Sequence, residues 1–113
     1  MKTITTTELK TLCDKKADLT LVNTLGHESF EKTKIPGAIN VPLESSDFAA
    51  RVEQEAGGKN KPVVVYCANQ QCNSSEKAAQ KLEAAGFTAV SRYTGGAAAW
   101  QKEAGELHAS QCG

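Results

Sequence analysis

The sequence predicts a single α/β domain built around a mostly parallel sheet. Short apolar runs alternate along the chain with segments of helical periodicity. The run from Pro62 to Tyr66 is apolar throughout, as in a strand that is buried on both faces of a sheet. A length of 113 residues suits one domain with one modest core. We assign residues 1–105 to the domain and residues 106–113 to a C-terminal tail.

The first half of the chain predicts three strands and three helices. Thr5 and Glu8 have the spacing of a capping box and open the first helix. Pro42 ends the third strand because it has no backbone N–H, and Ser46 or Asp47 is placed to cap the third helix. The predicted strands span residues 3–5, 19–23 and 39–43, and the predicted helices span about 6–15, 27–33 and 47–56.

The second half predicts two further strands and two helices. Ser74 or Ser75 is placed to cap the longer helix, and Gly86 to close it. The pair Gly95-Gly96 predicts a close backbone approach before the last helix, and Trp100 on that helix is expected in the core or at its rim. The predicted strands span residues 63–66 and 87–91, and the predicted helices span residues 76–85 and 97–104.

Cys67 is the candidate nucleophile. It directly follows the buried strand, at the edge of a parallel sheet where ligands bind, and it faces the start of a helix. The N–H groups and positive dipole of a helix start favour an anion, and they favour a thiolate for the same reason. Residues 68–75 are small, polar and loop-forming, so we expect none of them to bury the sulfur. This expectation favours a reactive thiol over a structural one.

The loop after Cys67 supplies the other candidate residues. Cys72 is either a resolving or relay thiol or an inert loop residue, and its spacing differs from that of thioredoxin-like pairs. With two cysteines here and no adjacent histidine, we expect no metal, and no phosphate-binding or dinucleotide motif indicates a cofactor. The expected anion- and substrate-binding residues are Ala68, Asn69, Gln70, Gln71, Asn73, Ser74 and Ser75.

Composition excludes several classes of partner. The formal net charge is zero, so no electrostatic argument indicates nucleic acid or an anionic membrane surface. No apolar run approaches the roughly 20 residues that span a bilayer, and the N-terminus lacks the apolar stretch of a signal peptide. We therefore expect a cytoplasmic protein.

Four segments together resemble the rhodanese-like domain family. Residues 35–42 read I-P-G-A-I-N-V-P, residues 63–67 V-V-V-Y-C, residues 84–87 A-A-G-F, and residues 93–100 Y-T-G-G-A-A-A-W. They match the family's signature, nucleophile strand and C-terminal ending in order and spacing. The resemblance implies a five-stranded parallel sheet with helices on both faces. It also implies sulfurtransferase chemistry through a persulfide on Cys67.

The chain departs from the family pattern around the nucleophile. Asn23 stands where the family commonly has an aspartate and Leu25 where it has an arginine, while Lys34 replaces the usual histidine. Asn23 and Lys34 are supporting candidates. Cys72 occupies the position of the arginine that usually closes the loop, so the chain resembles a subgroup with a C-x-x-x-x-C loop. The loop thereby lacks a bidentate cationic clamp for an oxyanion.

The leading hypothesis is a sulfurtransferase or sulfur carrier. The donor would be thiosulfate, a thiol persulfide or a sulfur-carrying protein, and the acceptor a thiol or a cyanide-like nucleophile. We expect weak activity with thiosulfate because the loop arginine is missing. Two alternatives stay open: a redox protein that cycles a Cys67–Cys72 disulfide, and a catalytically weak module that binds a partner.

Overall fold

The computed structural model describes residues 2–14, 19–33, 35, 38–68 and 73–104. Its sheet has five strands in the order β1-β5-β4-β2-β3, and every neighbouring pair is parallel. The strands are β1 (Lys2–Ile4), β2 (Thr20–Asn23), β3 (Ile39–Asn40), β4 (Val63–Tyr66) and β5 (Val90–Tyr93). The predicted α/β class and parallel sheet are confirmed, and β4 is the central strand.

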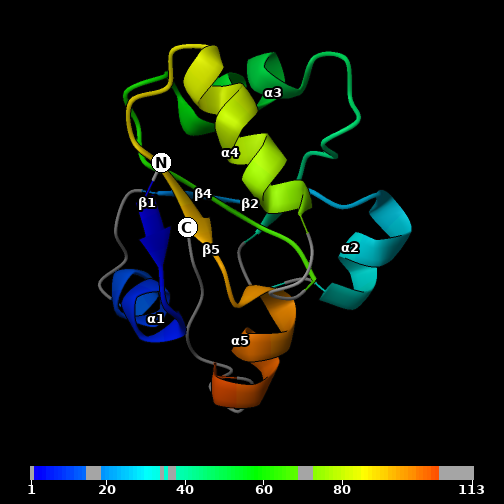
Figure 1. Cartoon of the computed structure of the whole chain (residues 1–113), viewed down its shortest axis with the longest axis vertical. Coiled ribbons are helices and arrows are strands. Elements are labelled where there is room, and N and C mark those ends of the chain that lie inside the picture. Colours follow the sequence, from blue (N-terminus) through cyan, green and yellow to red (C-terminus); the bar gives the residue numbers. More distant parts are fainter. Residues whose placement is uncertain (1, 15–18, 34, 36–37, 69–72, 105–113) are drawn as a thin grey trace.

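Helices cover both faces of the sheet (Figure 1). They are α1 (Thr6–Asp14), α2 (His27–Thr33), α3 (Phe48–Ala56), α4 (Ser74–Ala84) and α5 (Gly96–Ala104). One apolar cluster joins the sheet to α1, α2 and α5, and a second joins it to α3 and α4. Val64 and Tyr66 of β4 belong to the first cluster, whereas Val63 and Val65 belong to the second. This alternation is what a strand buried on both faces requires.

Trp100 lies in the first cluster with 4% of its surface exposed, so its predicted core position is confirmed. The predicted capping box is also present: the Thr5 backbone N–H donates to Glu8 Oε1, and the Glu8 N–H donates to Thr5 Oγ1, both at 3.1 Å. Asp47 holds the N-cap position of α3, but its side chain makes no capping hydrogen bond. No helix within the described ranges has the length and apolar character needed to cross a bilayer.

Three predicted boundaries were wrong. Strand β3 ends at Asn40, whereas the predicted strand extended to Leu43. Helix α4 begins at Ser74, because the Lys77 N–H donates to the Asn73 carbonyl, so Ser74 and Ser75 lie inside the first turn and do not cap it. Strand β5 begins at Val90 and not at Phe87. Phe87 still belongs to the end of α4, since its N–H donates to the Leu82 carbonyl after the turn at Gly86, where φ is 101°.

A close backbone approach precedes α5, as the Gly95-Gly96 pair predicts. A Cβ at Gly95 would lie 2.6 Å from the Cβ of Ala99 and 3.3 Å from the Tyr93 hydroxyl. Gly96 has φ 65°, in the left-handed region that favours glycine. The two glycines therefore let α5 start close to the end of β5.

We expect Gly95→Ala to destabilise the fold by about 1–3 kcal/mol, because the added methyl group overlaps that of Ala99. Ala99→Gly should remove the overlap, so the double variant should lose less stability than the sum of the single variants. Urea unfolding of the wild type, both single variants and the double variant measures this coupling. Strictly additive losses would show that the two methyl positions do not clash.

Candidate functional site

The central strand delivers Cys67 to the carboxyl edge of the sheet. Strand β4 is buried along its whole length between β2 and β5, and Cys67 is the next residue. All five strands are parallel, so their carboxyl ends share this edge. Helices α4 and α5 begin after β4 and β5, so both helix starts lie at the same edge (Figure 1). Cys67 therefore occupies the position at which parallel sheets bind ligands.

Backbone hydrogen bonds hold the chain on both sides of Cys67. The Tyr66 carbonyl accepts from the Thr24 N–H at 3.1 Å and from Thr24 Oγ1 at 3.3 Å. The carbonyls of Cys67 and Ala68 accept from the N–H groups of Ala97 and Ala98, each at 2.9 Å. The first turn of α5 thus anchors the backbone at Cys67, so the tight start at Gly95-Gly96 matters for the position of this residue.

The Cys67 sulfur contacts a hydroxyl from α4. The Cys67 thiol donates to Ser75 Oγ at 3.6 Å, within hydrogen-bonding distance for sulfur. Both residues are almost completely buried, with 1% of their surface exposed. Arg92 on β5 donates from Nε to the same Ser75 oxygen at 2.9 Å. Cys67, Ser75 and Arg92 therefore form a continuous polar chain from β4 through α4 to β5.

The expectation that no residue of 68–75 buries the sulfur was wrong. Ser75 does so because α4 begins earlier than predicted, which turns its side chain inward to Cys67. Of the other predicted loop residues, Ala68 and Ser74 are half-buried and Asn73 is exposed. Asn73 is the N-cap of α4 but makes no side-chain capping bond. The predictions for Asn69, Gln70, Gln71, Cys72 and Lys34 fall outside the described residues.

Asn23, predicted to support the site, is fully buried and organises the turn after β2. Its Oδ1 accepts from the Leu25 N–H at 2.9 Å, and its Nδ2 donates to Thr33 Oγ1 at 3.0 Å. Asn40 reinforces the turn, since its Nδ2 donates to the carbonyls of Asn23 and Leu25. The described hydrogen bonds of Asn23 thus go to Leu25, Thr33 and Asn40, and they hold the turn that follows β2.

Arg92 is the residue that sequence reasoning missed. The predicted last strand ended at Ser91, which left Arg92 in a connection. The observed register pairs Arg92 with Val65 and Val90 with Val63. Arg92 therefore lies on the same face as Val90, the face covered by α4. The sequence held a signal for this position, because Arg92 follows Val90 by two residues and the alternation of a strand places both side chains on one face.

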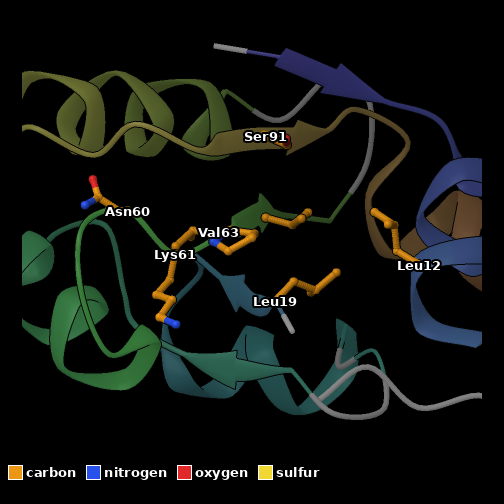
Figure 2. A pocket seen from close by; sticks show the side chains of 8 residues that line it. Leu12, Leu19, Asn60, Lys61, Val63 and Ser91 are labelled. Carbon is orange, nitrogen blue, oxygen red and sulfur yellow. The ribbon is translucent and has the colours of Figure 1, made fainter. Parts of the chain in front are cut away.

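One pocket lies away from this site. The pocket of about 510 Å³ in Figure 2 is lined by Pro62 and Val63 at the amino end of β4, together with Leu12, Leu19, Asn60, Lys61, Val64 and Ser91. Cys67 lies at the other end of the same strand, so the pocket is separate from the thiol. Within the described residues, no group of three or more His, Cys, Asp or Glu side chains is arranged to hold a metal ion.

Comparison with known proteins gives a consistent family. The model of the rhodanese-like domain family matches residues 5–103. The BH2092 protein of Bacillus halodurans is 28% identical, with a TM-score of 0.77 over 90% of this chain and 72% of that one. The single-domain sulfurtransferase RDL2 of Saccharomyces cerevisiae is 18% identical, with a TM-score of 0.74 over 93% of this chain and 92% of that one.

A thiosulfate sulfurtransferase of Pseudomonas aeruginosa is 21% identical, with a TM-score of 0.74 over 90% of this chain but only 19% of that one. At these identities the RDL2 and Pseudomonas structures establish a shared fold. A search of curated proteins found no match.

Tyr66, which precedes Cys67, gives a test of the frame around the site. Its hydroxyl accepts from the Ile35 N–H at 3.0 Å and donates to the Thr33 carbonyl at 3.2 Å. We expect Tyr66→Phe to lower the free energy of unfolding by about 1–3 kcal/mol, because these buried backbone groups lose their partner. Chemical unfolding at neutral pH measures the loss. A neutral substitution would show that the hydroxyl does not anchor the segment.

Tyr66→Phe should also change how the free energy of unfolding depends on pH in the alkaline range. Burial raises the pKa of Tyr66 above its ordinary value of 10.0. The folded protein therefore keeps this proton at a pH where the unfolded chain has lost it, so the stabilisation present below pH 10 is lost as pH rises further. The stability difference between wild type and Tyr66→Phe should accordingly shrink above pH 10.

Proposed function

The chain belongs to the rhodanese-like family, and from this premise we propose that it is a sulfurtransferase or sulfur carrier that works through a persulfide on Cys67. The observation that carries the proposal is the position of the Cys67 sulfur. It lies at the carboxyl edge of the central strand, 3.6 Å from a buried hydroxyl, beside the starts of two helices. These groups favour a negative charge on sulfur.

The proposed chemistry has two balanced steps. The Cys67 thiolate attacks the outer sulfur of a donor, a sulfur–sulfur bond forms, and the remainder of the donor leaves with the electron pair of the broken bond. A thiosulfate donor would release sulfite, and a thiol persulfide would release a thiolate. In the second step a thiol or cyanide-like acceptor attacks the outer sulfur, and the Cys67 thiolate leaves.

The loop sequence favours a particular class of donor. Residues 68–75 contain no arginine, so the loop offers no bidentate clamp for the oxyanion of thiosulfate. A persulfide on a small thiol or on a carrier protein carries less charge to be bound. We therefore propose a persulfide donor, with thiosulfate as a poor substitute.

Intact mass tests the proposal. We expect the wild-type protein to gain one sulfur atom after treatment with glutathione persulfide, and Cys67→Ser to gain none. Cys13→Ser and Cys112→Ser are matched controls that remove other cysteines and should keep the gain. An equal gain on Cys67→Ser, or no gain on wild type, would reject sulfur loading at Cys67; in the second case a partner-binding module would explain the fold better.

Cys72 tests how the persulfide is resolved. We propose that the Cys72 thiolate attacks the inner sulfur of the Cys67 persulfide, which forms a Cys67–Cys72 disulfide and releases hydrosulfide. Loaded Cys72→Ser should then hold its extra sulfur several-fold longer than loaded wild type, as followed by mass over time. Equal lifetimes would exclude Cys72 from resolution. A Cys67–Cys72 disulfide formed by mild oxidation in unloaded protein would support the redox alternative.

A further inference from the structure

We propose that Arg92 is the positioning residue that stabilises the Cys67 thiolate, acting through the Ser75 hydroxyl. This inference rests on the proposed function only for the purpose of the thiolate, which is to attack a sulfur donor. The observation behind it is the chain of contacts in which Arg92 Nε donates to Ser75 Oγ at 2.9 Å and Ser75 Oγ lies 3.6 Å from Cys67 Sγ.

The hydrogen-bonding capacity of a hydroxyl gives the chain a direction. A serine hydroxyl has one hydrogen to donate and two lone pairs that accept. Because a guanidinium only donates, Arg92 must use one of these lone pairs and never the hydrogen. While Cys67 is protonated, its thiol donates to the Ser75 oxygen. Once the thiol ionises, the direction reverses and the hydrogen of Ser75 is available to the negatively charged sulfur. Donation by a cation polarises the O–H bond and strengthens its donation in turn.

The charge of Arg92 favours the same protonation state. The side chain is partly buried on the α4 face of the sheet, so water screens it less than it screens an exposed cation. A guanidinium carries its charge at every physiological pH. Arg92 also lies next to the first turn of α4, whose dipole is positive at that end, and this arrangement becomes favourable when an anion lies between them. Through Ser75, which contacts both residues, Arg92 is linked to the Cys67 sulfur.

Few other described groups compete for this role. Strand β2 and the described side chains of α5 carry no titratable group. The first turn of α4 carries a half-buried Glu76 and an exposed Lys77.

The tyrosine hydroxyls near the site have other partners. The Tyr66 hydroxyl hydrogen-bonds to the backbone of Thr33 and Ile35, and the Tyr93 hydroxyl shares a hydrogen bond with Thr6. Arg92 is therefore the partly buried cation, among the described elements around Cys67, whose contacts lead to the sulfur.

This assignment also accounts for the loop sequence. The family's usual loop arginine is replaced by Cys72, which removes a fixed cation from the sequence between β4 and α4. Arg92 supplies a cation from the neighbouring strand β5 instead. Unlike a loop arginine, Arg92 acts on the sulfur through the Ser75 hydroxyl and from a strand of the sheet. It can therefore stabilise the thiolate before a sulfur donor binds.

The test is a thiolate titration. In protein whose other cysteines are replaced by serine, ultraviolet absorbance follows ionisation of Cys67, with the Cys67→Ser protein as the blank for tyrosine. We expect Arg92→Gln to raise the midpoint by about one pH unit, at the low end of the effect of a neighbouring opposite charge. At a fixed pH below the midpoint, the thiolate fraction and the rate of persulfide loading should fall about tenfold.

Two further variants separate the relay from a structural role. Arg92→Lys keeps the charge and should give a midpoint below that of Arg92→Gln. Ser75→Ala should raise the midpoint by itself. Adding Arg92→Gln to it should raise the midpoint by less than Arg92→Gln does alone, because only the through-space effect of the charge is left once the relay is broken. Arg51→Gln, on the exposed surface of α3, is the matched control and should leave the midpoint unchanged.

The outcomes separate this inference from the proposed function. An unchanged midpoint in Arg92→Gln, a midpoint in Arg92→Lys no lower than in Arg92→Gln, or fully additive effects of the Arg92 and Ser75 changes would overturn the role of Arg92. None of these results would affect sulfur loading of the wild type. Conversely, a wild type that never loads sulfur but shows the expected midpoint shifts would reject the proposed function and retain the inference.

Discussion

The site depends on the fixed position of one backbone segment, the two residues after β4. Their carbonyls accept hydrogen bonds from Ala97 and Ala98 in the first turn of α5, while the Tyr66 carbonyl just before them is held by Thr24 after β2. Cys67 is thereby tied to the elements on both sides of the central strand. Such anchoring fixes the sulfur relative to α4, so that a hydroxyl from a different element can meet it.

Opposing effects act on the sulfur in this position. Burial disfavours a thiolate and can raise a pKa by as much as about 3–5 units. Helix starts and neighbouring cations act in the other direction and bring reactive cysteines into a range of roughly 3.5–7.5. At Cys67 the groups in contact are the Ser75 hydroxyl, in the first turn of α4, and the Arg92 guanidinium behind it. We expect these groups to outweigh the effect of burial on the thiol.

The sequence predicts the frame of the site well because the signals are local. A β-branched run marks β4, the Thr5 and Glu8 pair marks the start of α1, and two glycines mark the approach to α5. The polar chain at the site was not predicted. It depends on the start of α4, which lies two residues earlier than predicted, and on the register of β5, which is set by pairing with β4, a strand far away in the chain.

These two boundaries had functional consequences. With Ser75 taken as a cap, its hydroxyl would have served the α4 backbone; inside the first turn it contacts Cys67 instead. When the predicted strand ended at Ser91, Arg92 could not be assigned to either face of the sheet. The observed pairing of Arg92 with Val65 places it on the face covered by α4. Errors of two residues at the ends of elements matter little for the fold. Here, however, they decide whether Cys67 is simply a cysteine before a polar loop or a thiol linked through Ser75 to a cation.

The most direct measurement of the account is the ionisation midpoint of Cys67 in the folded wild-type sequence, with the other cysteines replaced by serine. The account predicts a midpoint clearly below the ordinary cysteine value of about 8.5, so that the thiolate predominates at neutral pH. A midpoint at or above that value would show that burial outweighs the donors, and it would contradict the central claim that this edge of the sheet holds a ready thiolate.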